Sequence, residues 1–406
     1  MSQQPRRSPV GFSKRLLDRS ALAIVEDLQR AGFETYLVGG CVRDLLLGEQ
    51  PKDFDVATSA RPNQVLRVFR RARVIGRRFK IVHVYRGRDI FEIATFRRTP
   101  EGLEGETESD DVAVIRDDNL FGTAEQDAHR RDFTVNALFL DPVAGEIVDW
   151  VGGLEDIEAR QLRSIGDPEV RFREDPVRIL RLIKFSRRLG LEPMPAEIQA
   201  ARNHARDLTL SAPARIAEEL FRLMRTGQME GVLDDLRYLD VLDVVLPELA
   251  GWLRADRARY ECLQRRLAVF DATVQDGAVP DYALSLALLF GPRAEAEFDP
   301  ETRTLPVEEL SQVPLRLLGE FQARARIPRT AIQGATALLL AQLRLDPPAW
   351  MPERLLRRRD PLRIVGQEGF ADALECLRCR LEGDGRDLEP YDRWHEWGLS
   401  QGLPLR

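Results

Sequence analysis

The sequence predicts an α+β protein, in which a domain with a small mixed β-sheet and helices precedes a mostly α-helical remainder. Short runs of β-branched and aromatic residues, typical of strands, occur up to Val151. From about Arg173 onward, apolar residues recur at helical spacing and strand patterns nearly vanish. The length of 406 residues exceeds one ordinary domain. We therefore expect a head at residues 1–150, a helical neck at 151–240 and a helical body or tail at 241–406.

The elements of the head follow from local patterns. Apolar residues every three or four positions predict helices, β-branched runs predict strands, and glycine-rich or polar stretches predict turns. The expected elements, in chain order, are a helix at 16–31, a strand at 36–38, a helix at 41–47 that ends at Gly48, a strand carrying Asp53 and Asp55, a helix at 62–71 capped by Thr58 or Ser59, a hairpin of strands 81–85 and 90–96, a mobile loop at 98–118, a strand or helix at 133–139 and a strand at 147–151. In the helical remainder, turns are expected at Gly291-Pro292, Asp299-Pro300 and Pro347-Pro348.

The composition is typical of a globular cytoplasmic protein. Hydrophobic residues make up 44% of the chain and charged residues 31%. No apolar run approaches the roughly 20 residues that span a membrane. The segment from Met1 to Pro9 is polar and lacks the apolar core of an export signal, so we expect a short disordered lead.

Four cysteines form no recognisable disulfide framework, which fits a reducing compartment. Cys376 and Cys379 are a Cys-x-x-Cys pair within a helical segment. A zinc site would need a second pair of cysteines or histidines nearby, and the sequence supplies none. We therefore expect no metal or redox centre at this pair.

The net charge of −6 argues against a protein coated in basic surface but is compatible with local basic patches. Arginine is abundant, and its planar guanidinium suits the recognition of phosphates and bases. A GC-rich genome would also enrich arginine, so composition alone does not decide whether nucleic acid is bound.

The most informative stretch is a glycine pair, Gly39-Gly40, followed by Asp53 and Asp55. The glycines permit a tight turn and a close approach of backbone to ligand, and the start of the next helix favours an anion. Arg43 would add a charge-assisted contact there. On a strand, Asp53 and Asp55 project to the same side and share divalent cations, which take oxygen ligands and bridge phosphates. Each half alone has a plain structural interpretation, as a turn or a solvated strand edge, but the order strand, turn, helix, strand favours a metal-bound triphosphate.

Three further sets of polar residues are candidates for the same site. Glu92, on the second hairpin strand, either faces water or gives the metals a third carboxylate. Arg130-Arg-Asp-Phe-Thr-Val-Asn136 combines cations, an acid and an amide, and is either a charged helix cap or a contact set for ribose and phosphate. In Arg173-Glu-Asp-Pro-Val-Arg-Ile-Leu-Arg181, a carboxylate and a guanidinium three residues apart form either a solvated ion pair or a pair that mimics a Watson–Crick edge.

These motifs together resemble one family. Leu37-Val-Gly-Gly-Cys-Val-Arg-Asp-Leu-Leu-Leu-Gly48 and Lys52-Asp-Phe-Asp-Val56 are similar to the signature of the class II template-independent RNA nucleotidyltransferases, which include bacterial poly(A) polymerases and CCA-adding enzymes. The specific motifs extend from about Phe33 to Gly190. The resemblance implies a nucleotidyltransferase head, a neck with a nucleotide- and RNA-binding segment, and an RNA-binding body.

The resemblance also implies roles for individual residues. Asp53, Asp55 and Glu92 are the expected metal ligands, and Asp132 joins them as a catalytic acid. The expected nucleotide contacts are Gly39, Gly40, Arg43, Arg131, Asn136, Asp175, Arg178 and Arg181, of which Asp175 and Arg178 would recognise the base. Two Mg²⁺ ions are the expected cofactors and ATP the expected substrate.

One segment favours the poly(A) polymerase branch of the family. Val74-Ile-Gly-Arg-Arg-Phe-Lys-Ile-Val-His-Val84 has a double arginine before the aromatic residue and a His-Val after it, whereas CCA-adding members more often resemble Gly-x-x-Phe-Gly-Thr-Val. Arg77, Arg78 and Lys80 are therefore expected RNA contacts. The strongly basic C-terminal tail that poly(A) polymerases often carry is missing from this sequence, and residues 354–359 are the nearest basic cluster.

The expected function is template-independent addition of AMP from ATP to RNA 3′ ends, as in mRNA processing by polyadenylation. The first alternative is a CCA-adding enzyme that extends tRNA with CTP and ATP. The second is a non-catalytic RNA-binding protein on the same fold, which the intact Asp53 and Asp55 argue against. The partners are RNA 3′ ends and ATP, with no membrane. The oligomeric state stays open.

Overall fold

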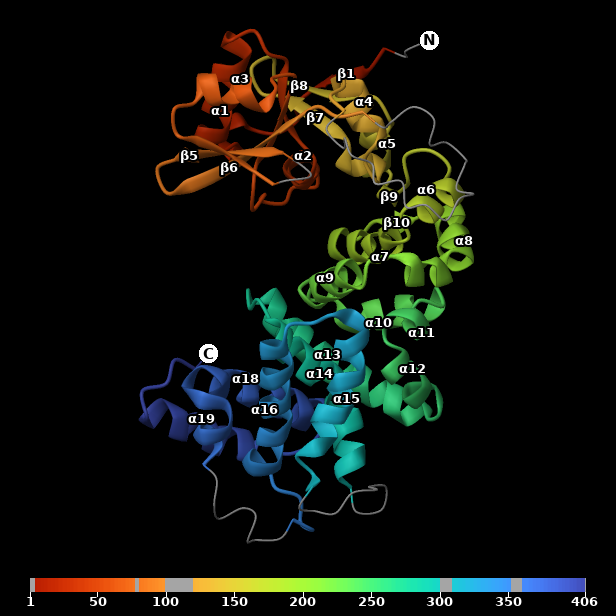
Figure 1. Ribbon diagram of the computed structural model, residues 1–406, viewed down its shortest axis with the longest axis vertical. Coiled ribbons are helices and arrows are strands. Elements are labelled where there is room, and N and C mark those ends of the chain that lie inside the picture. The colour runs from red at the N-terminus through yellow and green to blue at the C-terminus, as the bar shows by residue number, and fades with distance from the viewer. Residues whose placement is uncertain (1–3, 77–79, 99–119, 300–308, 352–359, 406) are drawn as a thin grey trace. The chain divides into compact units, whose positions relative to one another are not determined.

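The computed structural model describes residues 4–76, 80–98, 120–299, 309–351 and 360–405. The chain forms two compact units. The first comprises Met1–Arg171 and Leu191–Glu197, and the second comprises Phe172–Gly190 and Ile198–Arg406. The prediction of an α+β protein with a mixed sheet before a helical remainder is confirmed (Figure 1). The division at 150 and 240 stays a prediction.

The first unit is built on an eight-stranded sheet with the order β1-β8-β7-β2-β3-β6-β5-β4. Only β3 and β6 run parallel, so the sheet is mixed. Its strands are β1 (Arg6–Pro9), β2 (Thr35–Val38), β3 (Asp55–Thr58), β4 (Ala72–Ile75), β5 (Ile81–Arg86), β6 (Asp89–Thr95), β7 (Leu138–Asp141) and β8 (Glu146–Asp149). A short pair, β9 (Gln161–Leu162) and β10 (Glu192–Pro193), lies apart from this sheet.

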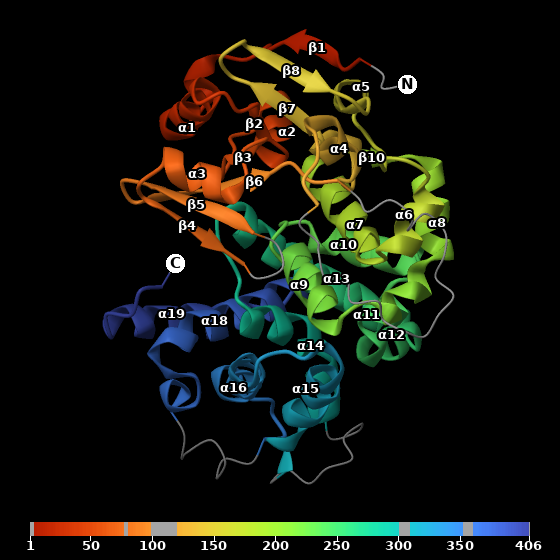
Figure 2. The ribbon, with the colours of Figure 1, turned by 45° about the horizontal axis from the view of Figure 1, so that its top comes forward.

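Helices cover the sheet on both faces (Figures 1 and 2). On one face lie α1 and α3, and α1 buries Ile24, Val25 and Leu28 at helical spacing. On the other, α4 packs Ala124 and Ala128 into a cluster with aromatic residues of the sheet. The helices of this unit are α1 (Arg19–Arg30), α2 (Gly40–Leu46), α3 (Pro62–Val68), α4 (Ala124–His129), α5 (Gly153–Glu158) and α6 (Pro168–Glu174), the last of which continues into the second unit.

The second unit is helical. Its core lies between α13, α14, α16 and α18, which contact one another and bury Phe270, Phe290 and Phe370. The helices from residue 177 onward are α7 (Val177–Leu189), α8 (Pro195–Asn203), α9 (Pro213–Met224), α10 (Met229–Tyr238), α11 (Leu242–Val245), α12 (Pro247–Arg254), α13 (Arg257–Gln275), α14 (Tyr282–Phe298), α15 (Gln312–Ala325), α16 (Arg329–Leu345), α18 (Pro361–Gly383) and α19 (Glu389–Ser400).

Several local predictions differ from the structure. Arg6–Pro9 is an edge strand paired with β8, where we expected a disordered lead. The helix that starts at Pro62 has Arg61 as its N-terminal cap residue, where we expected Thr58 or Ser59. It ends at Val68, earlier than predicted, and the strand β4 follows. Gly291 and Pro292 lie inside α14, where a turn was predicted, because the surrounding residues are buried on all sides. The expected mobile loop at 98–118 falls almost entirely outside the described residues.

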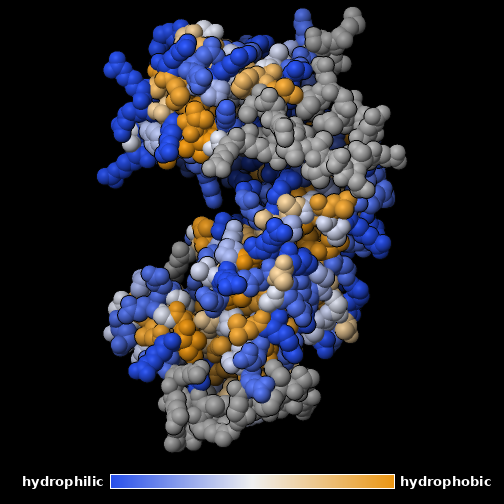
Figure 3. Space-filling model, in the orientation of Figure 1, coloured by the Kyte–Doolittle hydropathy of each residue, from blue (hydrophilic) through white to orange (hydrophobic). Residues whose placement is uncertain are grey.

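Hydrophilic side chains cover most of the surface visible in Figure 3, with apolar patches between them. Among the described residues, no helix is long and apolar enough to cross a membrane.

Candidate active site

The turn after β2 requires glycine at its first position. Gly39 has φ 70° and ψ −126°, which side-chain-bearing residues rarely adopt. A Cβ on Gly39 would also lie 2.9 Å from Nη1 of Arg131. Helix α2 starts at Gly40, one residue before the predicted start, and Gly48, two residues after its end at Leu46, has the left-handed φ of 81° that stops a helix. The turn therefore brings bare backbone next to a guanidinium group, an arrangement that suits a phosphate.

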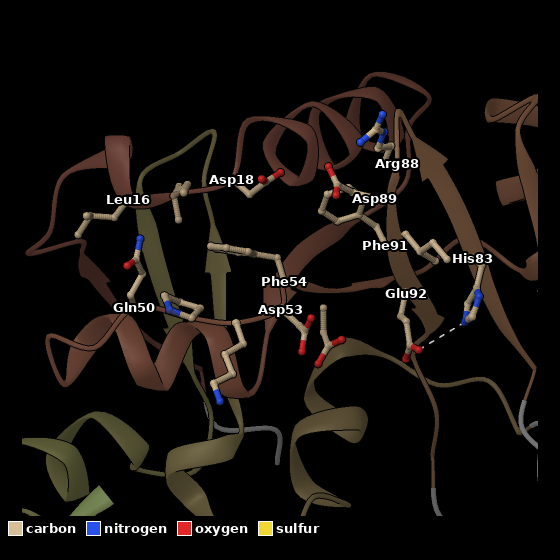
Figure 4. Close-up of a pocket in the computed structure, with 15 residues that line it drawn as sticks. Leu16, Asp18, Gln50, Asp53, Phe54, His83, Arg88, Asp89, Phe91 and Glu92 are labelled. Atoms are coloured by element: carbon tan, nitrogen blue, oxygen red, sulfur yellow. Dashed lines mark ion pairs between the residues drawn. The ribbon is translucent and has the colours of Figure 1, made fainter. Parts of the chain in front are cut away.

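The three predicted metal ligands, Asp53, Asp55 and Glu92, are among the residues that line one cavity of about 890 Å³ (Figure 4). Asp55 is the first residue of β3, and Asp53 precedes the strand instead of lying on it as predicted. The parallel register pairs Val56 of β3 with Ile93 of β6. Asp55 and Glu92, each one residue earlier, therefore lie side by side on neighbouring strands.

The charges of these three acids act on one another. Surrounding protein atoms displace water near the Asp55 carboxyl and raise its pKa, although its side chain opens on the cavity. The charges of Glu92 and Asp53 raise this pKa further, and Arg131 opposes them. Closely spaced carboxylates that destabilise one another's charge fit a site for hard divalent cations. Within the described residues, however, no three His, Cys, Asp or Glu side chains are already placed to hold a metal, so the three-ligand assignment stays a prediction.

His83 pairs with Glu92 in the same cavity. The two residues are directly opposite in the β5–β6 register, and Nε2 of His83 lies 3.4 Å from Oε1 of Glu92 (Figure 4). The Glu92 side chain is 54% exposed, so it faces the cavity instead of the core. The neighbouring histidine restricts where this flexible carboxylate points.

A buried network joins three of the predicted nucleotide-site residues. Arg43 donates to Oδ1 of Asp44 at 2.6 Å and to Oδ1 of Asn136 at 2.5 Å. The Asn136 amide donates to Oδ1 of Asp132 at 3.0 Å. Arg43 is only 3% exposed, so its guanidinium supports the wall behind the glycine turn, and its predicted phosphate contact stays a prediction.

Arg131 is held beside the glycine turn by Asp127 of α4. Nη2 of Arg131 lies 3.1 Å from Oδ2 of Asp127, and Nη1 donates to the carbonyl of Asn136 at 3.0 Å. Asp127 is buried, but the charges of Arg131 and Arg130 outweigh that burial and lower its pKa. The Arg131 guanidinium also lies over the ring of Phe139. The arginine is thus fixed before any ligand arrives.

Asp175, Arg178 and Arg181 belong to the second unit, around the start of α7. Oδ2 of Asp175 accepts from Arg215 of α9 at 2.8 Å, whereas its Oδ1 is shielded from solvent with no hydrogen-bond partner among the described residues. Arg178 pairs with Glu174 at 3.3 Å, and Arg181 lies 3.6 Å from Glu219. Their role in base recognition stays a prediction.

The predicted RNA contacts and the cysteine pair stay predictions, and several of these residues lie outside the described part of the chain. Arg77, Arg78 and the cluster at 354–359 lie outside the described residues, while Lys80 is exposed just before β5. Cys376 and Cys379 are buried, which raises the pKa of both thiols, and no metal-binding group was found in the described part of the chain.

Sequence reasoning did not assign His83, Asp127 or Asp44 to the site. In the sequence, His83 served only to distinguish one branch of the family. Its partner Glu92 lies on the other strand of the hairpin, so the local pattern did not link the two residues. The spacing from Asp127 to Arg131, four residues on one helix, was a usable signal for an ion pair. Asp44 follows Arg43 directly, and nothing in the local pattern indicated that both would be buried together.

Comparison with known proteins places these residues within recognised domains. Residues 35–163 match the family model "Poly A polymerase head domain", and residues 190–253 match "Probable RNA and SrmB- binding site of polymerase A". The head match contains every carboxylate and arginine described above for the first unit.

Individual proteins are similar over different lengths. Poly(A) polymerase I of Haemophilus influenzae is 42% identical over 96% of this chain and 87% of that protein. The CCA-adding enzyme of Lactobacillus helveticus is 38% identical over 50% of this chain and 49% of that protein. The structure of the Bacillus stearothermophilus CCA-adding enzyme in complex with CTP matches with a TM-score of 0.68 and 27% identity, over 94% of this chain and 82% of that one.

Proposed function

The chain belongs to the class II family of template-independent RNA nucleotidyltransferases, and from that membership we propose that it adds AMP from ATP to RNA 3′ ends. The observation that carries this choice within the family is the extent of the matches. In sequence, the poly(A) polymerase I relative matches nearly the whole chain at 42% identity, whereas the CCA-adding relative matches half of it at 38%. The CCA-adding structure that covers 94% of the chain is 27% identical. The segment up to His83, with its double arginine, points to the same branch.

In the proposed reaction, the RNA 3′ hydroxyl attacks the α-phosphate of ATP and pyrophosphate leaves. Asp53, Asp55 and Glu92 would hold two Mg²⁺ ions, which when bound lower the pKa of the attacking hydroxyl and neutralise charge on the leaving oxygens. The mutual repulsion of these carboxylates supports the assignment, because a bound cation relieves it. Asp132, linked to Asn136, is the further acid of the site.

The glycine turn and Arg131 would receive the triphosphate. Only a residue without a Cβ leaves room there, since Arg131 already lies against Gly39. The N–H groups at the start of α2 and the fixed guanidinium are donors that need no rearrangement when the nucleotide binds.

Asp175 and Arg178 would recognise adenine. Asp175 has one carboxylate oxygen anchored by Arg215 and one shielded oxygen without a hydrogen-bond partner in the described structure. An acceptor of that kind suits an exocyclic amino group of a base, because a shielded acceptor left unpaired costs free energy. Arg181 would assist in holding the nucleotide.

One assay tests the proposed function. Purified protein is given each labelled nucleoside triphosphate with unstructured RNA and, separately, with tRNA that lacks its 3′ end. We expect long adenylate tails on unstructured RNA and little incorporation of CTP. A discrete three-nucleotide product on truncated tRNA, made only when CTP is present, would instead identify a CCA-adding enzyme. Absence of any transfer, with RNA still bound, would support the non-catalytic alternative.

A further inference from the structure

Among the described residues of the first unit, none covers one face of the strands β4, β5 and β6, at the end of the sheet away from α4. Burial alternates along the hairpin: Val82 and Val84 of β5 and Phe91 and Ile93 of β6 are buried, while the residues between them are exposed or half-buried. Such alternation means that one face packs on the core and the other is open. We call the open side the hairpin face, and its residues are Arg73, Ile75, Ile81, His83, Tyr85 and Ile90.

The strand register connects the hairpin face to the catalytic acids in a single row. Arg73 of β4 is opposite His83 of β5, and His83 is opposite Glu92 of β6. Glu92 lies beside Asp55 of β3, and Asp55 is opposite Val38, the last residue before the glycine turn. Residues directly opposite on neighbouring strands share a face. Across the sheet the order is therefore glycine turn, Asp55, Glu92, His83, Arg73.

This order fixes the direction from which the RNA approaches. In phosphoryl transfer the attacking and leaving oxygens are roughly in line on opposite sides of the phosphorus atom. If the triphosphate lies at the glycine turn and its α-phosphate at Asp55 and Glu92, then pyrophosphate leaves on the β2 side. The attacking 3′ hydroxyl must come from the β5 and β4 side, which is the hairpin face.

We propose that the hairpin face binds the last nucleotides of the RNA strand being extended. This inference rests on the proposed function for its direction. Neighbouring strands are about 4.8 Å apart, so the three steps from β3 to β4 span roughly 14 Å, room for a few nucleotides behind the reacting hydroxyl.

The side chains of the hairpin face have the chemistry that single-stranded RNA requires. Arg73 is exposed and makes no hydrogen bond or ion pair with the described residues, so its guanidinium is available to a phosphate. Tyr85 offers a ring for stacking, and Ile90, which is 53% exposed, offers an apolar contact. Stacking and apolar contacts accept any base, so the terminal nucleotides would be held without sequence preference.

Equilibrium binding of a fluorescent oligoadenylate, measured by anisotropy over a series of salt concentrations and without ATP, tests the proposal. We expect Arg73→Ala to weaken binding on the order of tenfold at low salt and to reduce the log–log salt slope by about 0.7, the value for one lost phosphate contact on a single strand. Tyr85→Ala should weaken binding on the order of tenfold with an unchanged slope, and Tyr85→Phe should bind as the wild type does. Direct titration with ATP should give the same affinity for every variant.

Arg67→Ala is the matched control, because Arg67 is also an exposed arginine and lies on α3, which covers the opposite face of the sheet. We expect its RNA affinity to be unchanged. The proposal is overturned if Arg67→Ala weakens binding as much as Arg73→Ala, or if the Arg73 and Tyr85 variants bind RNA normally. Loss of RNA affinity in these variants of a protein that transfers no adenylate would support the hairpin face while refuting the proposed function.

Discussion

Asp55 of the first unit and Glu219 of the second are carboxylates in opposite surroundings. Asp55 lies next to two other acids, and its pKa is raised by burial and by their charges. Glu219 is more deeply buried, yet Lys184 at 2.7 Å, Arg222 at 2.7 Å and Arg181 at 3.6 Å lower its pKa. The fold therefore destabilises the ionised form of Asp55 and stabilises the ionised form of Glu219.

This difference in surroundings distinguishes a carboxylate of the proposed metal site from a carboxylate that stabilises the fold. A carboxylate surrounded by cations has all its partners within the chain, and it joins α7 to α9. The charges of Glu92 and Asp53 at Asp55 are opposed within the chain by Arg131, yet the pKa of Asp55 is still raised, which fits the proposed cation site. The comparison predicts that removal of the Asp55 carboxylate lowers activity but not stability, whereas removal of the Glu219 carboxylate lowers stability.

The largest effect is expected at Asp55. Asp55→Asn removes a proposed metal ligand without changing volume, so turnover in Mg²⁺ should fall at least on the order of a thousandfold. The same change relieves like-charge repulsion, so the metal-free variant should be no less stable than the wild type. Single-turnover kinetics and urea unfolding in a chelator measure the two quantities. Near-normal turnover would refute the assignment of Asp55.

Glu219→Ala should show the reverse. It leaves Lys184 buried without its partner, which costs on the order of 3–5 kcal/mol of unfolding free energy. Glu218→Ala is the matched control, since its exposed pair with Arg222 contributes about 0–1 kcal/mol. Urea denaturation compares them. Equal losses in the two variants would mean that the buried pair does not stabilise the second unit as argued.

A smaller effect is expected for base selection by the second unit. Arg178→Ala should reduce the preference for ATP over other nucleotides by roughly tenfold, because lost hydrogen bonds leave neighbouring groups unpaired. Competition between labelled ATP and GTP measures this preference. Arg202→Ala, which breaks an exposed pair with Asp240, should leave it unchanged. Unaltered selectivity in Arg178→Ala would leave Arg178 with a structural role through its ion pair with Glu174.

The smallest effect is the pH dependence of stability, which has opposite signs for the two acids. The pKa of Asp55 in the folded protein lies above its unfolded value of about 3.9. The wild type therefore loses stability relative to Asp55→Asn as pH rises from the unfolded pKa through the folded pKa. The folded pKa of Glu219 lies below its unfolded value of about 4.3. Its contribution is therefore present above that pH and is lost as pH falls through the folded pKa. Unfolding free energies of the metal-free wild type, Asp55→Asn and Glu219→Gln across acidic pH test both signs, and parallel curves would contradict them.

The elements that sequence reasoning recovered are those whose pattern is local. The strand before Gly39, helix α2 and the β5–β6 hairpin combine a strong apolar period with glycine turns, so propensity and packing agree. The strands β1 and β4 escaped because both lie at sheet edges, where few residues are buried and pairing with a distant strand supplies the stability. The turn predicted at Gly291-Pro292 was wrong because burial in the core of the second unit keeps α14 helical, although the local sequence favours a turn.

The candidate site was predictable as a set of residues but not as an arrangement. The spacing of Asp53 and Asp55 indicated a shared metal. In contrast, Glu92 lies beside Asp55 because β3 and β6 pair in parallel, and no local pattern predicts that pairing. The burial of Arg43 depends likewise on Asn136, which lies 93 residues further along the chain. Long-range neighbours decide such contacts, and the sequence does not specify them.

The pairing of β1 with β8 has a consequence for how the chain folds during synthesis. Arg6–Pro9 pairs with Glu146–Asp149, and β2 pairs on one side with β7. The strands β2 to β6 are complete once residue 95 has emerged, so the half of the sheet with Asp55 and Glu92 is able to form early. From Pro9 to Asp149 the ribosome adds 140 residues, so at about 5–20 residues per second the first strand waits roughly 7 to 28 seconds for its partner. Until then the β2 edge, next to the glycine turn, has no strand beside it, and a nascent chain stalled in that interval would present an open edge to other chains.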